Sequence, residues 1–84
     1  MYITTHKSML IRYIDEIHTT ELGLERIKKN LSLGDIDIIN YIKELIQNPN
    51  SKVIMKGKNL YVDIDDINIT INSSNFCVIT AHKK

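Results

Sequence analysis

Tryptophan is absent from the 84 residues of this sequence, and cysteine and proline occur once each. The single cysteine, Cys77, cannot close a disulfide within the chain, and the N-terminus lacks the order of a signal peptide, so we expect a cytoplasmic location. No hydrophobic run approaches the roughly 20 residues that a membrane-spanning helix needs, so no membrane partner is expected. Close, paired ligand spacing for zinc is also missing, and we predict no metal and no cofactor.

A strong net charge is missing as well. The formal charge is only +1, so the sequence lacks the long-range positive field of a protein that coats nucleic acid. What is present is a globular balance of 43% hydrophobic and 25% charged residues, which argues against disorder. A chain this short has room for one hydrophobic core. We therefore predict a single domain over residues 1–84, with a helical half at about 7–47 and a sheet half at about 52–82.

The first part of the chain has helical periodicity. Apolar residues recur every three or four positions between residues 7 and 17, which predicts an amphipathic helix. Thr19 or Thr20 would cap a second helix, and Gly23 would weaken the first turn of that helix. The residues of the second helix that should face the core are Leu24, Ile27 and Leu31.

A third helix is expected to begin near residues 32–35, where Ser32 and Asp35 have the spacing of a capping box. Pro49 and its turn-forming neighbours should end this helix. Its apolar stripe would comprise Ile38, Ile39, Ile42, Leu45 and Ile46.

After residue 51 the hydrophobic period changes from that of a helix to the alternation of a strand. Short turns separate four predicted strands, and connections this short imply antiparallel neighbours. The sequence therefore predicts an α+β fold in which two or three N-terminal helices pack on one face of a C-terminal four-stranded antiparallel meander. The strands are expected at 52–56, 60–64, 67–72 and 76–81.

Alternate residues of a strand point to opposite faces, so the sequence also divides the predicted sheet into two sides. The apolar alternates of the strands at 60–64 and 67–72 should face the helices. In the last strand, the register that best matches this alternation turns Cys77, Ile79 and Ala81 toward the helices. The open face would then hold Phe76, Val78, Thr80 and His82 with Tyr61, Thr70 and Asn72, and with Lys58 and Lys83 near its margins.

The ionisable side chains allow functional and structural interpretations. His82 could transfer protons beside cationic lysines or simply belong to a soluble terminus, and His18 could be a second proton carrier or a packing residue. Two basic patches could bracket a phosphate backbone or form solvated surfaces. The patches comprise Arg26, Lys28 and Lys29, and Lys52, Lys56 and Lys58. An acidic cluster of Asp63, Asp65 and Asp66 is interpreted as a solvated turn, with divalent-metal binding as the alternative.

Several segments resemble a family of short bacterial proteins of unknown function. They are HTTELGLERI at 18–27, GKNLYV at 57–62, ITIN at 69–72 and ITAHK at 79–83. The resemblance covers nearly the whole chain and brings no established activity. Leu60 departs from it, because tryptophan is expected there, and this slightly weakens the case for base stacking at that position.

More distantly, helices followed by a meander that ends in an Ile-Thr-Ala-His strand are similar in layout to the barnase, EndoU, colicin and RelE group of small ribonucleases. The resemblance implies cleavage of RNA without a metal, through the 2′-hydroxyl of the substrate. Carried over, it makes His82 and His18 the proton-transfer groups and Arg26 and Lys58 the stabilising cations. The substrate-binding group would comprise Tyr61 as a stacking surface with Thr70, Asn72, Thr80 and Lys83.

Three functional hypotheses follow from the sequence. The first is a small RNA-acting protein, such as a toxin-like ribonuclease with an antitoxin as partner. The second is a non-enzymatic phage or mobile-element protein that inhibits a host nuclease or defence complex, in the manner of an anti-CRISPR, or sequesters a nucleotide signal. The third is a homodimer that uses the open face as its interface.

Overall fold

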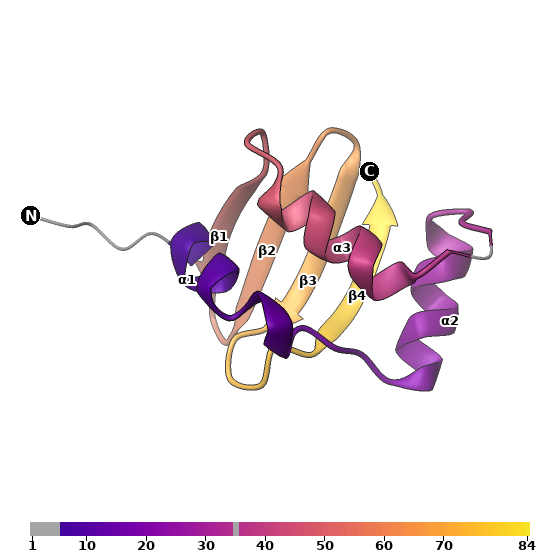
Figure 1. The fold of residues 1–84 in the computed structure, drawn as a ribbon, viewed down its shortest axis with the longest axis horizontal. Coiled ribbons are helices and arrows are strands. Elements are labelled where there is room, and N and C mark those ends of the chain that lie inside the picture. Colours follow the sequence, from indigo (N-terminus) through magenta and orange to yellow (C-terminus); the bar gives the residue numbers. More distant parts are fainter. Residues whose placement is uncertain (1–5, 35) are drawn as a thin grey trace, which may run out of the picture.

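The computed structural model describes residues 6–34 and 36–84. Its elements are the helices α1 (His6–Arg12), α2 (Glu21–Asn30) and α3 (Ile38–Gln47), a short 3-10 helix η1 (Ile14–Glu16), and the strands β1 (Lys52–Lys56), β2 (Asn59–Ile64), β3 (Ile67–Asn72) and β4 (Val78–Lys83). The four strands form one antiparallel sheet in chain order. The helices pack against it (Figure 1), which confirms the predicted α+β class.

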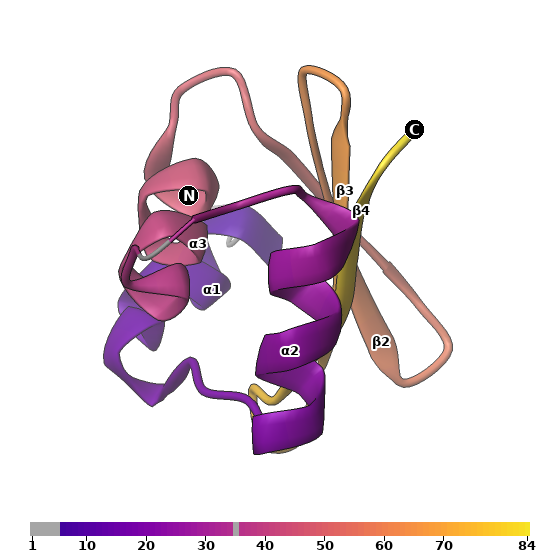
Figure 2. The ribbon, with the colours of Figure 1, turned by 90° about the vertical axis from the view of Figure 1, so that its right-hand side faces the viewer.

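The helices lie on one side of the sheet. Figure 2 shows α1 and α3 together on that side, and α2 running along β4. The ammonium group of Lys7 in α1 donates to the backbone oxygens of Asn48 and Ser51, at 2.7 and 2.9 Å. These bonds tie the first helix to the segment that leads from α3 into β1. None of the helices in the described ranges is long and apolar enough to cross a bilayer.

Helix α2 begins as the sequence predicts. The hydroxyl of Thr20 accepts the backbone N–H of Gly23 at 3.0 Å, which satisfies one of the free amides of the first turn. Gly23 also has a packing role, because a Cβ at this position would collide with the Thr19 hydroxyl. That hydroxyl donates to the Val78 carbonyl of β4 at 2.8 Å. The glycine therefore lets the start of α2 approach the last strand.

The boundaries of the other helices differ from the prediction. The helix expected over residues 7–17 ends at Arg12, and η1 then redirects the chain so that Ile17 is buried. Helix α3 begins at Ile38 rather than near Ser32, and Asp37 caps it by accepting the Asn40 N–H at 3.2 Å. Ser32 has a φ of 54°, which ends α-helical geometry there. Asp35 of the expected capping box lies outside the described residues.

The core lies between the helices and one face of the sheet. The predicted stripe of α3 is confirmed, since Ile38, Ile42 and Ile46 are buried. Ile27 in α2 and Leu31 directly after it are buried as expected, whereas Leu24 is 38% exposed and the expectation for it was wrong. The sheet contributes eight buried side chains to this core. They are Leu60, Val62, Ile64, Ile67, Ile69, Ile71, Val78 and Ala81.

The pairing of β3 with β4 corrects the predicted register. Ile71 pairs with Val78, but Thr70 pairs with Thr80, so a β-bulge leaves Ile79 as the extra residue. Val78 is therefore 1% exposed and Ile79 is 43% exposed, the reverse of the expectation. Beyond the bulge the predicted register holds, with Ala81 buried and paired to Ile69.

The start of the last strand was also predicted too early. Phe76 and Cys77 precede β4, and both are half-buried. Phe76 stacks on Tyr13 with ring centroids 5.4 Å apart, on the helical side rather than on the open face. Its φ of 60° is unusual for a bulky residue and sets the turn into β4.

Candidate functional site

The side of the sheet turned away from the helices carries three rows of side chains, which we call the open face. Cross-strand pairing defines the rows, because paired residues point to the same side. The middle row contains Ile54, Tyr61, Thr70 and Thr80. One flanking row contains Lys52, Asp63, Asn68 and His82, and the other contains Lys56, Asn59 and Asn72.

The middle row supplies the apolar surface of the open face. Ile54 in β1 is 60% exposed, and Tyr61 lies beside it in β2 and is half-buried. Thr70 is only 8% exposed, although it belongs to this face. An isoleucine and a tyrosine side by side on an otherwise polar sheet form a small apolar platform.

The row that contains Asp63 carries most of the charge. Asp63 lies between Lys52 on one neighbouring strand and Asn68 on the other, and it forms an ion pair with the Lys84 ammonium group. Both side chains of this ion pair are about half-exposed. His82 pairs with Asn68 at the far side of the row and is exposed.

In the third row, the side chain of Asn72 holds a turn of the fold. The side-chain oxygen of Asn72 accepts the Ser74 N–H at 2.8 Å and the Asn75 N–H at 3.4 Å. Asn72 thus stabilises the connection between β3 and β4. Of the residues expected to bind a substrate, it is the one whose side-chain oxygen is already used within the fold.

Two hollows lie on the open face and meet at Ile54, Tyr61 and Asn68. The larger has a volume of about 450 Å³ and extends to Lys56 and Gly57 at the β1–β2 turn. The smaller has a volume of about 280 Å³. It extends to Lys52, Asp63 and Lys84. Each hollow therefore has an apolar wall and at least one lysine.

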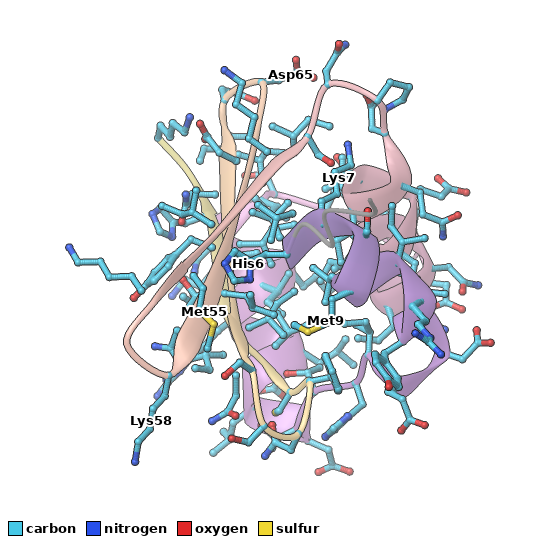
Figure 3. The ribbon with its side chains drawn as sticks, turned by 90° about the vertical axis from the view of Figure 1, so that its left-hand side faces the viewer. His6, Lys7, Met9, Met55, Lys58 and Asp65 are labelled. Carbon is cyan, nitrogen blue, oxygen red and sulfur yellow. The ribbon has the colours of Figure 1, made fainter. Side chains whose placement is uncertain are left out.

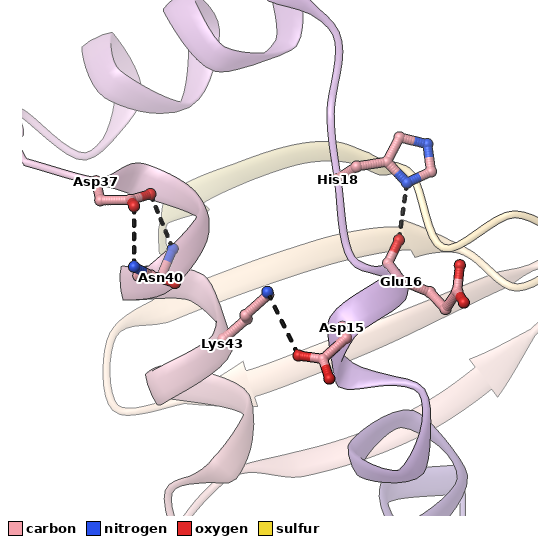
Figure 4. Close-up of polar contacts among 6 residues, drawn as sticks. All are labelled: Asp15, Glu16, His18, Asp37, Asn40 and Lys43. Atoms are coloured by element: carbon pink, nitrogen blue, oxygen red, sulfur yellow. Dashed lines mark hydrogen bonds and ion pairs between the residues drawn. The ribbon is translucent and has the colours of Figure 1, made fainter.

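His18 lies away from these hollows. Its ring Nδ1 is 2.8 Å from the carbonyl of Glu16 (Figure 4), and its backbone forms a parallel bridge to Cys77. Cys77 precedes His82 by five positions, which along a strand corresponds to about 16 Å. The two histidines expected to share proton transfer are therefore not neighbours.

The expected cations are also dispersed. Arg26 is an exposed residue of α2, which packs on the helical side. Lys58 projects from the β1–β2 turn at one end of the sheet (Figure 3), and the turn that contains Asp65 lies at the other end, near His82. Lys83 pairs with Ile67, whose side chain faces the core, so it does not belong to the open face.

The structure thus brings the expected site residues Tyr61, Thr70, Asn72, Thr80 and His82 onto one surface. The remaining expected catalytic residues, His18, Arg26 and Lys58, lie elsewhere. Sequence reasoning left Ile54 and Lys84 out of this surface, and it placed Asn68 on the open side without giving it a role. Lysine and isoleucine alternate at every second position of β1, and this pattern could have placed Ile54 on the open face. Within residues 6–34 and 36–84, no group of three or more His, Cys, Asp or Glu side chains is placed to hold a metal ion.

Comparison with known proteins identifies a family. Residues 11–82 match the family described as "Protein of unknown function (DUF3781)", and the chain belongs to it. This confirms the expected membership of an uncharacterised family. No curated protein and no solved structure matches the chain. The similarity in layout to the small ribonucleases therefore stays a prediction.

Proposed function

We propose that this member of the DUF3781 family binds single-stranded RNA on the open face of its sheet. The observation that carries the proposal is the apolar platform of Ile54 and Tyr61, which lines both hollows and has lysines on either side. Proteins that bind single strands commonly combine an aromatic stacking surface with a positively charged path for the backbone. The open face offers both.

Stacking would supply the part of the affinity that does not depend on sequence. Every base has a π-face, and unpaired RNA bases can turn outward onto an aromatic ring. Tyr61 is half-buried between Ile54 and Thr70 on the neighbouring strands, so its ring is positioned before a ligand arrives. A ring that is already ordered loses little conformational entropy on binding.

The charges favour an anionic ligand on this side of the molecule. Lys52, Lys56 and Lys84 line the hollows, and Asp63 is the acidic residue among them. The nearly neutral chain therefore has a local positive surface beside its apolar platform. Contacts between lysines and phosphates release counterions, so the affinity should fall as salt is added.

The arrangement favours binding over cleavage. Cleavage through the 2′-hydroxyl needs one group to take a proton and another to give one, both within hydrogen-bond reach of the reacting atoms. His82 lies on the open face, but His18 and Arg26 lie elsewhere in the fold. A ribonuclease would therefore need a different second proton-transfer group from the one that the sequence suggested.

Fluorescence anisotropy with a labelled oligouridylate tests the proposal. Tyr61→Ala should weaken binding about 5-fold to 150-fold, the effect of about 1–3 kcal/mol per stacked base. Tyr61→Phe should retain most of the affinity because it keeps the ring. Leu22→Ala is the matched control, since Leu22 is 68% exposed on α2, away from the open face.

Two results would contradict the proposal. One is an absence of binding at low salt, and the other is a Tyr61→Ala variant that binds as tightly as the wild type. Electrophoresis of the same RNA after incubation separates binding from cleavage. Fragments that appear without added metal and disappear in His82→Ala would support the ribonuclease hypothesis instead.

A further inference from the structure

We propose that the smaller hollow, next to the Asp63–Lys84 ion pair, selects guanine at one position of the bound strand. This inference depends on the proposed RNA binding and adds a base preference to it. The hollow is lined by an apolar pair, an acidic group, an amide and two ammonium groups. These are Ile54 and Tyr61, Asp63, Asn68, and Lys52 and Lys84.

The apolar pair and the polar groups of this hollow suit a base that lies flat on Tyr61. Tyr61 and Asp63 are two positions apart in β2 and point to the same face, which places them about 6.6–6.8 Å apart along the strand. A base that stacks on the ring therefore extends its edge toward the carboxylate. Asn68, opposite Asp63 on β3, lies along the same edge.

Guanine matches the order of donors and acceptors that the ion pair presents. Its Watson–Crick edge carries two adjacent N–H donors, at N1 and N2, followed by the O6 acceptor. Asp63 Oδ1 is buried against the Lys84 ammonium group, so Oδ2 is the oxygen that can accept from both donors, and the ammonium group can donate to O6. The other bases present one donor beside an acceptor there, so they place an acceptor atom against the carboxylate.

The ion pair does not block such a ligand. The two oxygens of a carboxylate have about four lone-pair sites, so Asp63 can retain Lys84 on Oδ1 while Oδ2 accepts bonds from a base. Both side chains are about half-exposed, so they are accessible from the hollow apart from the buried Oδ1 of Asp63. Lys52, which pairs with Asp63 from β1, is placed to contact the adjacent phosphate.

The larger hollow lacks an equivalent group. Among the residues that the structure describes, its lining contains Lys56 and Gly57 in place of the ion pair and no carboxylate. A nucleotide bound there would stack against Ile54 and Tyr61 without a strong base preference. The two hollows therefore predict that the protein selects the base of one nucleotide and accepts any base at the neighbouring nucleotide.

The test compares oligouridylates that carry one central guanosine, inosine or adenosine, or no substitution. A single guanosine avoids the self-association of guanine-rich strands. The guanosine strand should bind about 5-fold to 150-fold more tightly than the adenosine strand, the discrimination expected of two hydrogen bonds to one base edge. Inosine keeps N1–H and O6 but lacks the N2 amino group, so it should fall between them.

Asp63→Asn should reduce the ratio of guanosine to adenosine affinity to about one, and Lys84→Gln should reduce it in part. Asp65→Asn is the matched control, because it removes the same charge from an exposed turn residue outside both hollows. It should leave the ratio as in the wild type. Circular dichroism of each variant verifies that the fold is retained.

The outcomes separate the two proposals. If all strands bind equally and Tyr61→Ala weakens them all, the base preference is wrong and RNA binding stands. If the preference survives in both Asp63→Asn and Lys84→Gln, the smaller hollow is not its source and the inference is overturned. If no strand binds, both proposals fail together.

Discussion

The two faces of the sheet show how one strand can serve two purposes. In β3, Ile67, Ile69 and Ile71 are buried under the helices, while Asn68 and Asn72 alternate with them on the open face and are half-exposed. The covered face is entirely apolar in β2 and β3, and the open face is mostly polar. Stability therefore depends mainly on one side, which leaves the other free to vary in its chemistry.

The largest expected effect comes from truncating neighbouring residues that lie on opposite faces. Ile69 is fully buried, so Ile69→Ala should lower the free energy of unfolding by about 2–5 kcal/mol through lost burial and a cavity. Asn68→Ala, on the open face, should change it by less than about 0.5 kcal/mol. Urea unfolding followed by circular dichroism measures both.

If Ile69→Ala and Asn68→Ala lower the free energy of unfolding equally, the contrast between the covered face and the open face is wrong. Equal losses would mean that the open face is covered in solution, for example by a second copy of the chain. A monomeric mass for the wild type at micromolar concentration would then decide whether a dimer explains the result.

A smaller effect is expected where α2 meets the last strand. In an open helix, Gly23→Ala would stabilise by about 1 kcal/mol. Here the added Cβ meets the Thr19 hydroxyl, so we expect a net loss of about 1–3 kcal/mol from overpacking. Gly34→Ala is the control, because nothing lies within 4 Å of a Cβ at that position. A more stable Gly23→Ala variant in thermal unfolding would show that the helix is not seated closely on β4.

The smallest effect is expected for the ion pair on the open face. Lys84→Gln should lower the free energy of unfolding by no more than about 1 kcal/mol, because both partners are about half-exposed and solvent screens their attraction. The difference from the wild type should diminish in 1 M salt. A loss as large as that of Ile69→Ala would indicate that the open face contributes to the stability of the fold.

The strands could be predicted closely because short turns and strict alternation define them. Three of the four expected ranges agree with the structure to within one residue, at 52–56, 60–64 and 67–72. The helices were predicted less well at their ends. Periodicity continues through Tyr13, so it cannot show that the chain changes to a 3-10 helix after Arg12.

The last strand shows a second limit of alternation. Val78 and Ile79 are consecutive apolar residues, and either could face the core. Alternation alone favoured Ile79, but the bulge selects Val78 and restores the predicted register at Thr80. Thr80 and His82 therefore lie on the open face as expected, although Phe76 and Val78 do not.

The grouping of the site residues was the part that the sequence could least predict. Cross-strand neighbours follow from alternation, so Tyr61, Thr70 and Thr80 could be placed in one row. The position of His18 depends on how the chain passes from η1 to α2, and no local pattern encodes that path. Only the folded chain shows that His18 bonds to the segment before β4 instead of facing His82.

The segment around His18 changes how the backbone amides of β4 exchange their protons with the solvent. Amides on the outer side of an edge strand normally exchange with deuterium quickly, because no neighbouring strand protects them. Here the Val78 N–H donates to the His18 carbonyl at 2.7 Å, and the His18 N–H donates to the Phe76 carbonyl at 3.3 Å. Exchange at Val78 is therefore controlled by the local opening that detaches the segment around His18 from the sheet.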